Sequence, residues 1–278
     1  MSRSAKSFIR GLILELGRVA DVASVTPQGS LGKLLRAWVV LTIKQRWGAG
    51  PRSGFVLDWD GPRGVVHGAV YDPSEIRVIR EVFVNDEYAL PADAAPETIL
   101  DLGSNVGMSL LYFRSRYPEA RIIGVEPSGN AFVRLQRNTR DLSNVRVIRA
   151  AAVGKSRPVE LAVTDESWTS SIYGDHAGHT VEQVTGLTIE QILDNAGWQR
   201  ADVIKMDVEG CEVEILETSA AARHADWLIF EFHQEHAQCD VWDLIKRLTD
   251  FEIVRVAGDT LRHPVVTLRR RAPAGRLS

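Results

Sequence analysis

The sequence has few cysteines and no excess of positive charge. Its 278 residues contain two cysteines, Cys211 and Cys239, and no Cys/His cluster with the spacing of a zinc site. We expect both to be reduced thiols, buried or half-buried, as in a cytosolic protein. Lysine and arginine number 33 against 36 aspartates and glutamates, which gives a net charge of −3 and a pI near 6.2. A polyanionic partner such as nucleic acid is therefore not expected.

Long apolar runs are also missing. The most apolar early stretch, Leu31–Ile43, is interrupted by Lys33 and Arg36 and is too short to cross a bilayer. No clear small-residue cleavage site follows the charged start of the chain, so it does not resemble a signal peptide. We therefore expect no stable membrane insertion and a cytoplasmic location. Apolar spacing in residues 8–46 predicts helices that pack on the main domain or on a second copy in a homodimer. A membrane-surface role is the less favoured alternative.

What the sequence does contain is a change of pattern near residue 97. Before it, helical spacing over the first ~50 residues gives way to two short β-like runs around a turn at 60–64. Asp72 and Pro73 then have the character of a helix start. After residue 97, strands and helices alternate, which predicts an α/β fold with a mostly parallel sheet. We divide the chain into an N-terminal helical and small β extension, residues 1–90, and a main domain, residues 91–278.

The two kinds of element in the main domain differ in their apolar spacing. The expected strands are Thr98–Leu102, Arg121–Glu126, Val145–Ala150, Val159–Val163, Asp202–Met206, Trp227–Phe232, Glu252–Val256 and Val265–Arg269. The expected helices are Met108–Tyr117, Asn130–Leu142, Thr188–Ala196, Cys211–Ser219 and Val241–Thr249. The last two strands have no helix between them, so one is expected to be antiparallel at or near the edge. A long connection from about residue 164 to 185 is expected to act as a lid.

A glycine-rich turn, Asp101-Leu-Gly-Ser-Asn-Val-Gly107, directly follows the first of these strands and opens a helix. Gly103 is expected to permit a tight turn where a side chain would collide with a ligand. Gly107 is expected to let the helix lie close to the strand. The turn belongs at the carboxyl end of the sheet, where doubly wound folds bind ligands.

Glu126 follows the next strand, where a carboxylate can accept two hydrogen bonds from ribose hydroxyls. Asp101 and Glu126 together would make the pocket negative, which suits a cationic sulfonium cofactor better than a pyrophosphate. An NAD site would need the pattern G-x-G-x-x-G, but Asn105 stands in place of the middle glycine and occupies the room that a pyrophosphate requires. A glycine turn with no ligand is the weakest interpretation, because it leaves Glu126 unexplained.

These segments resemble the FkbM family of methyltransferases over roughly residues 97–235. The resemblance is carried by Ile99–Gly107, Val125–Pro127, Asn144–Val153, Phe230–His233 and above all Ile204–Glu212, which has the form K-x-D-x-E-G-x-E. It implies a class I methyltransferase domain with a Rossmann-like, doubly wound sheet that binds S-adenosylmethionine and usually methylates oxygen. Substrate choice is then expected to reside in the N-terminal third, which the resemblance does not cover.

The resemblance also implies which residues hold the cofactor. Carried over by position, Asp101, Gly103 and Asn105 line its methionine part, Glu126 its ribose, and Ala151 or Ala152 its adenine. The remaining expected cofactor-binding residues are Ser104, Gly107, Pro127 and Asp207. Ser104 departs from the family, in which alanine is common at this position.

The expected catalytic groups follow the fourth and fifth strands of the main domain. An acceptor hydroxyl must lose its proton during methyl transfer, so a base or a metal is expected. We expect Asp207 and His233 to be catalytic, with His233 as the general base. The alternative is that Asp207, Glu231 and His233 hold a divalent cation such as Mg²⁺. For Glu212 we favour a structural role, at the start of the helix that follows Gly210.

The function expected from the sequence is S-adenosylmethionine-dependent O-methylation of a small-molecule hydroxyl, with a saccharide or glycoside as the favoured acceptor. One alternative is an NAD-dependent oxidoreductase or epimerase of Rossmann type. The other is a non-catalytic protein that binds S-adenosylmethionine.

Overall fold

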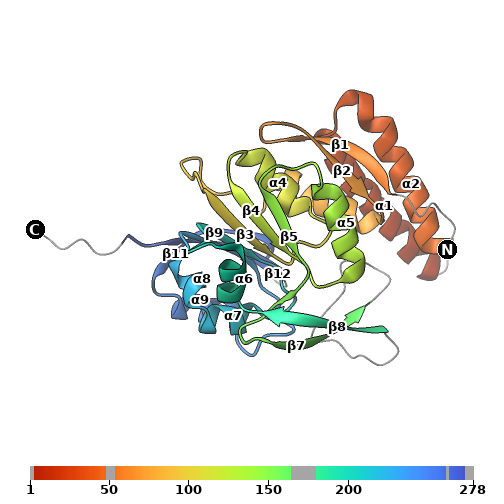
Figure 1. The fold of residues 1–278 in the computed structure, drawn as a ribbon. Coiled ribbons are helices and arrows are strands. Elements are labelled where there is room, and N and C mark those ends of the chain that lie inside the picture. The colour runs from red at the N-terminus through yellow and green to blue at the C-terminus, as the bar shows by residue number, and fades with distance from the viewer. Residues whose placement is uncertain (1–2, 48–53, 164–179, 261–262, 273–278) are drawn as a thin grey trace, which may run out of the picture. The chain divides into compact units, whose positions relative to one another are not determined.

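The computed structural model describes residues 3–47, 54–163, 180–260 and 263–272. The chain forms two compact units (Figure 1): the first comprises Met1–Glu87 and Leu111–Arg116, and the second comprises Tyr88–Leu110 and Tyr117–Ser278. Among the described helices, none combines the length and the apolar character needed to span a bilayer. The residues expected to form a lid fall mainly in 164–179, including Trp168 and Tyr173, and so lie outside the described part of the chain.

The first unit contains helices and one hairpin, as the sequence predicts. Its elements are α1 (Arg3–Ser24), η1 (Gln28–Ser30), α2 (Leu31–Trp47), β1 (Phe55–Gly61), β2 (Gly64–Val70), α3 (Pro73–Ile79) and η2 (Arg80–Val84). The predicted helix start is confirmed, because the Asp72 carboxylate accepts a hydrogen bond from the Ser74 amide at 2.9 Å and Pro73 is the first residue of α3. Asp58 joins α2 to the hairpin, since it accepts hydrogen bonds from Lys33 (2.8 Å) and Ser30 (2.6 Å).

The second unit is built on a seven-stranded sheet with the order β11-β12-β10-β9-β3-β4-β5. The strands are β3 (Thr98–Leu102), β4 (Arg121–Val125), β5 (Val145–Ile148), β9 (Val203–Met206), β10 (Trp227–Glu231), β11 (Phe251–Asp259) and β12 (His263–Arg270). All neighbours from β5 to β10 are parallel, whereas β12 pairs antiparallel with both β10 and β11. The mostly parallel α/β sheet with an antiparallel edge is thereby confirmed.

The helices of this unit cover a sheet whose central strands are buried along their whole length. They are α4 (Met108–Arg116), which continues into the first unit, α5 (Gly129–Thr139), α6 (Ile189–Ala196), α7 (Glu212–Thr218), α8 (Ala220–His224) and α9 (Val241–Arg247). One large apolar core joins side chains of β3 and β4, such as Leu100 and Ile123, to Ile192 on α6, Leu216 on α7 and Leu244 on α9. Burial on this scale is the main favourable contribution to the stability of the unit.

One strand differs from its expected place. Residues 159–163 were expected among the alternating strands, but β7 (Arg157–Val163) pairs with β8 (Thr180–Leu187) in a separate three-stranded sheet, in which β8 also pairs with β6 (Ala151–Ala152). Figure 1 shows the β7–β8 pair beside α7, and an ion pair from Arg157 to Glu214 on that helix joins them at 2.7 Å. The strand β8 was not predicted from the sequence, because its alternating apolar and polar residues follow a segment that has no strand signal.

Candidate functional site

The expected site residues follow strands that end at the same edge of the sheet. Leu102 at the end of β3 pairs with Val125 of β4 on one side and with Met206 of β9 on the other, and Met206 pairs with Phe230 of β10. Gly103, Glu126, Asp207 and His233 come directly after these strands or within three residues of them. The chain leaves β3 toward β4 in one direction and β9 toward β10 in the other. Ligands of open α/β sheets bind at such a switch point.

The glycine turn is shaped by the protein backbone itself. Gly103 has φ +76°, and a Cβ atom there would lie 1.7 Å from the carbonyl oxygen of Asp207. A Cβ atom at Gly107, where φ is +96°, would lie 2.8 Å from Leu135 of α5. Gly103 is thus required by the approach of the chain after β9, and Gly107 by the approach of α5. Clearance for a ligand at Gly103 and close helix–strand packing at Gly107 stay predictions.

Glu126 is held beside this turn by two backbone amides. Its carboxylate accepts hydrogen bonds from the amides of Asn105 and Ser128, both at 2.8 Å. Burial raises the pKa of Glu126 to about 7, because the two amides only partly compensate for the loss of solvation. The carboxylate therefore has a fixed position and titrates near neutral pH.

Asp101 does not face an open pocket, contrary to the expectation that it adds negative charge there. Its side chain is fully buried, forms an ion pair with Lys205 at 3.1 Å and accepts a hydrogen bond from Ser109 at 2.5 Å. Ser104 is also buried and donates its hydroxyl to the carbonyl oxygen of Asp101 at 3.0 Å. Both side chains stabilise the turn from its buried side, and the ammonium group of Lys205 balances the charge of Asp101.

Lys205 is the residue that the sequence analysis did not assign to the site. Its ammonium donates to the carbonyl oxygen of Gly103 at 2.9 Å and lies 5.3 Å from the centre of the Tyr88 ring. Burial alone would lower the pKa of Lys205, but the carboxylates of Asp101 and Asp207 outweigh it, and the net pKa is raised. A lysine within the buried strand Val203–Met206 was the available signal, because an unpaired lysine is almost never fully buried.

The remaining expected cofactor residues include Asn105 and Pro127, which lie beside Glu126, and Ala151 and Ala152, which lie in β6. Asn105 has φ +47°, is half-buried, and its side-chain oxygen has no hydrogen-bond partner among the described residues. Pro127 is half-buried and adjoins Glu126 in the chain. Ala151 and Ala152 are buried in β6, where they pair with Gly186 and Leu187. The orphaned oxygen of Asn105 is an acceptor available to a ligand at the turn.

A cluster of carboxylates surrounds His233 at the ends of β9 and β10. The Nδ1 atom of His233 lies 2.9 Å from Glu212, while Nε2 lies 3.4 Å from Glu209 and 3.8 Å from Asp207. Glu212 is buried and also accepts hydrogen bonds from the amides of Val208 (3.2 Å) and Gly210 (3.3 Å). Glu212 thus has the structural role expected for it at the start of α7, where it binds amides of the preceding loop, and in addition it orients the imidazole.

The electrostatics of this cluster affect the role expected for His233. Burial would lower the pKa of His233, but the hydrogen bond to Glu212 and the charges of Glu212, Asp207 and Glu209 raise it to about 10. The imidazole therefore carries a proton at neutral pH in this arrangement, which does not suit a general base. Burial and the neighbouring Asp207 raise the pKa of Glu209 to about 8. Glu209 also has φ +51°, a backbone conformation that costs free energy and often occurs at functional sites.

The structure divides the expected metal ligands between two groups. Within the described residues, Asp207, Glu209 and His233 form one group that could hold an ion, and Glu231, His233 and His263 form another. The expected set of Asp207, Glu231 and His233 is therefore not brought together as one group, and His233 is shared. His263 lies 30 residues beyond His233 in the chain, so the sequence gives no sign that the two histidines belong to one group.

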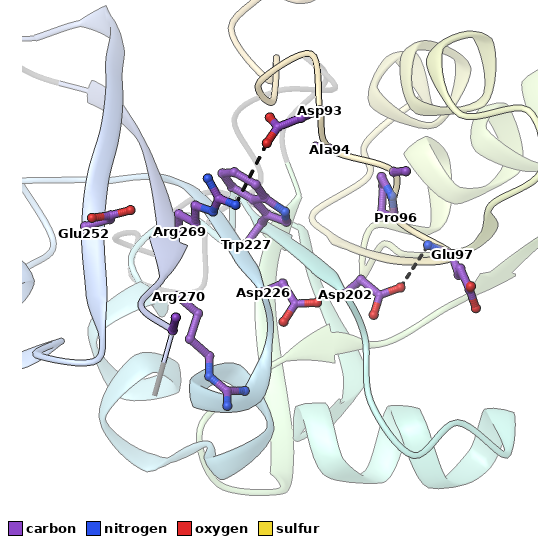
Figure 2. A pocket seen from close by; sticks show the side chains of 12 residues that line it. Asp93, Ala94, Pro96, Glu97, Asp202, Asp226, Trp227, Glu252, Arg269 and Arg270 are labelled. Atoms are coloured by element: carbon purple, nitrogen blue, oxygen red, sulfur yellow. Dashed lines mark hydrogen bonds and ion pairs between the residues drawn. The ribbon is translucent and has the colours of Figure 1, made fainter. Parts of the chain in front are cut away.

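A cavity of about 560 Å³ lies at the opposite edge of the sheet, where β3, β9 and β10 begin (Figure 2). Charged side chains that line it make contacts within the protein. Asp202 accepts hydrogen bonds from the amides of Glu97 (2.9 Å) and Thr98 (3.0 Å). The Arg269 guanidinium lies 5.2 Å from the centre of the Trp227 ring. None of the site residues expected from the sequence lines this cavity, and its network serves to join the strands.

Comparison with known families gives one match that covers more than half of the chain. A family model described as Methyltransferase FkbM domain matches residues 101–255. This range includes the glycine turn, Glu126 and the carboxylate cluster around His233.

Individual relatives are more distant. The chain is 26% identical over 160 residues to Methyltransferase 1 of Beauveria bassiana, an alignment that covers 49% of this chain but less than two thirds, 64%, of that protein. It is 24% identical over 173 residues to Methyltransferase sdnD of Sordaria araneosa, covering 50% of this chain and 67% of the relative. Among solved structures, P. horikoshii TYW2 in complex with MeSAdo matches with 14% identity and a TM-score of 0.45, over 84% of this chain and 82% of that one.

Proposed function

The chain belongs to the FkbM family of methyltransferases, and from this premise we propose that it transfers the methyl group of S-adenosylmethionine to a hydroxyl oxygen of a small molecule. The α/β sheet with its antiparallel edge is the class I methyltransferase fold. The single observation that carries the proposal is the place of Glu126, a buried carboxylate fixed beside a glycine turn at the switch point of the sheet.

The residues at the strand ends fit this cofactor. Each carboxylate oxygen of Glu126 accepts one backbone amide and retains capacity for a ribose hydroxyl. The unpartnered oxygen of Asn105 is a suitable acceptor for the amino group of the methionine part. Negative charge for the sulfonium comes from Asp207 and from the ionised form of Glu126, since Lys205 neutralises Asp101.

The chain must also orient the acceptor and take up its proton. When bound, the cofactor would supply an electrophilic methyl group, with the thioether of S-adenosylhomocysteine as the leaving group. Asp207 is the better placed of the two expected catalytic residues, because its side chain is 27% exposed whereas that of His233 is 4% exposed. We assign proton uptake from the acceptor hydroxyl to Asp207. His233 contacts Glu212 and faces Glu209, and we assign it to the positioning of this cluster.

Divalent-metal assistance is a further part of the proposal. Asp207 and Glu209 supply carboxylate oxygens, the ligands that Mg²⁺ prefers, and Mg²⁺ is often bound by one or two carboxylates with water completing its shell. Loss of activity with a chelator, restored by Mg²⁺, is expected. Activity that is unchanged after chelation would remove the metal from the proposal while leaving methyl transfer intact.

Calorimetry with S-adenosylmethionine and with S-adenosylhomocysteine tests the cofactor. We expect both to bind, Glu126→Ala to abolish binding, and Glu119→Ala, at an exposed position, to leave it unchanged. Absence of binding at millimolar cofactor would contradict the proposal. A change in nicotinamide absorbance with candidate sugars would instead favour the oxidoreductase alternative.

The acceptor is then sought with methyl-labelled cofactor and a panel of alcohols. We expect saccharides or glycosides to be labelled in preference to polyketide-like or aromatic alcohols, and Asp207→Asn to reduce labelling even when the cofactor is at a saturating concentration. Cofactor binding with no transfer to any hydroxyl in the panel would favour the non-catalytic alternative.

A further inference from the structure

The two histidines nearest the site are brought together by the direction of one strand. Because β12 runs antiparallel to β10, its first residues lie at the edge where β10 ends, and Glu231 pairs with Val265. The amide of Phe232 donates to the carbonyl oxygen of Pro264 at 3.0 Å, which joins the backbone after β10 to the start of β12. His263, the first residue of β12, is thereby placed beside Glu231 and His233.

The side chains of Glu231, His233 and His263 lie close together, but neither Glu231 nor His233 forms a direct hydrogen bond with His263. Its Nδ1 atom lies 3.8 Å from the Glu231 carboxylate, and its ring centre lies 5.1 Å from that of His233. One ligand atom from each of Glu231, His233 and His263 lies within 4.8 Å of the others. The Nδ1 atom of His263 is buried and has no hydrogen-bond partner among the described residues. A buried polar atom left in this state calls for an explanation such as an ion.

His233 is oriented as a metal-binding histidine is. Its Nδ1 atom is held by Glu212 at 2.9 Å, and Glu212 is fixed in turn by backbone amides of the loop before α7. Among the described residues, the Nε2 atom of His233 has no partner as close as this and faces Glu209 at 3.4 Å and Asp207 at 3.8 Å. Histidines that bind metals usually donate their other ring N–H to a carboxylate or carbonyl, which fixes the ring and raises its basicity.

We propose that Glu231, His233 and His263 form a binding site for a divalent transition metal that takes imidazole nitrogen, such as Zn²⁺. Two imidazoles and one carboxylate suit Zn²⁺, Fe²⁺ or Co²⁺, whereas Mg²⁺ and Ca²⁺ prefer oxygen ligands. Ligand atoms about 2.1 Å from one Zn²⁺ ion lie roughly 3–3.5 Å apart, so side chains now separated by 3.8 Å (His263 to Glu231) and by at most 4.8 Å within the group must move closer together when the ion binds. The ion would take the place of the proton on Nε2 of His233.

The site is accessible, and it shares only His233 with the group that contains Asp207 and Glu209. Side-chain exposures of 33% for His263 and 26% for Glu231 leave a path for an ion to enter. Three protein ligands leave a further position open for an oxygen of the methyl acceptor. This last role rests on the proposed function, whereas binding of the metal does not.

Metal binding can be measured on the full chain after treatment with EDTA and removal of the chelator. Calorimetry and metal analysis with Zn²⁺ alone should give one ion per chain. His263→Ala should weaken binding at least about tenfold, and Glu212→Gln should weaken it roughly 10- to 100-fold by releasing the His233 ring. The matched control His224→Ala removes an exposed histidine and should leave binding unchanged.

Each alternative result has a distinct meaning. Absence of Zn²⁺ binding, or equal loss in the His224→Ala control, would overturn the proposal. Binding that survives His263→Ala but is lost in Asp207→Asn would place the ion in the other group and would overturn it as well. If His263→Ala does not fold, as judged by circular dichroism, the same loss is required of Glu231→Gln. Calorimetry with S-adenosylmethionine on the same samples reports separately on the proposed function.

Discussion

The backbone carbonyl oxygen of Asp207 occupies the space that a side chain at Gly103 would need. A Cβ atom at position 103 would lie 1.7 Å from that oxygen, a separation that no adjustment of a side-chain rotamer can relieve. The loops after β3 and β9 are therefore packed backbone to backbone at the centre of the site. Any residue larger than glycine must move one of the two loops.

Gly103→Ala should destabilise the protein and displace the turn. We expect the free energy of unfolding to fall by about 2–4 kcal/mol, from the combined cost of positive φ and overpacking. Urea denaturation measures this loss. Gly29→Ala is the control, since nothing lies within 4 Å of a Cβ atom there. If Gly103→Ala and Gly29→Ala are equally stable, the loops after β3 and β9 can move apart at a smaller cost in free energy than their packing indicates.

Lys205→Met should leave Asp101 as a buried charge without its partner. Breaking a buried ion pair from one side costs about 3–5 kcal/mol of stability, and here the hydrogen bond to Gly103 is lost as well. Thermal or urea denaturation checks the loss, with the exposed Lys155→Met as a control that should not change stability. Combining Lys205→Met with Asp101→Asn should recover part of the loss. A double variant that is no more stable than Lys205→Met would argue that the charge of Asp101 is not the cause.

Cofactor affinity should depend on pH through Glu126. Burial raises the pKa of this carboxylate to about 7, so it becomes protonated as the pH falls below 7 and can then accept fewer hydrogen bonds from a ribose. The dissociation constant for S-adenosylmethionine should therefore be constant above about pH 8 and rise as the pH falls, by up to about tenfold per unit well below the pKa. Lys205 and Asp207 act on this pKa in opposite directions and do not remove the effect.

Calorimetry between pH 6 and pH 8.5 tests this dependence. Glu126→Gln should bind the cofactor more weakly at every pH and without the rise at low pH. Glu119→Gln should behave as the unaltered chain does. An identical pH profile in Glu126→Gln would assign the titration to another group.

Asp202→Ala should loosen the opposite edge of the sheet. The carboxylate accepts hydrogen bonds from the amides of Glu97 and Thr98 and from Arg200, so its removal leaves several donors without a partner. We expect a loss of about 2–3 kcal/mol, measured by urea denaturation, against no loss for Asp141→Ala at an exposed position. Although burial raises the pKa of Asp202, these bonds lower it below 3.8 on balance. Its contribution should therefore be complete above pH 3.8 and disappear as the pH falls further.

The central part of the fold and of the site could be predicted because it depends on local patterns. Alternating apolar runs predicted the parallel strands, and the glycine turn with Glu126 predicted the edge at which the site residues gather. Residues whose role depends on distant neighbours could not be placed. Lys205 neutralises Asp101 from the next strand, and His263 reaches His233 only because β12 is antiparallel. The strand β8 was missed because it follows a segment with no strand signal, and residues 180–185 were expected to belong to the long connection.

The parallel strands place only their last residues at the edge of the sheet where Gly103 and Glu126 lie, whereas β12 places its first residues there. Segments that are far apart in the sequence therefore lie next to one another at this edge of the sheet. Substitutions at the start of β12 should therefore alter the proposed metal group while the turn around Gly103 is left unchanged.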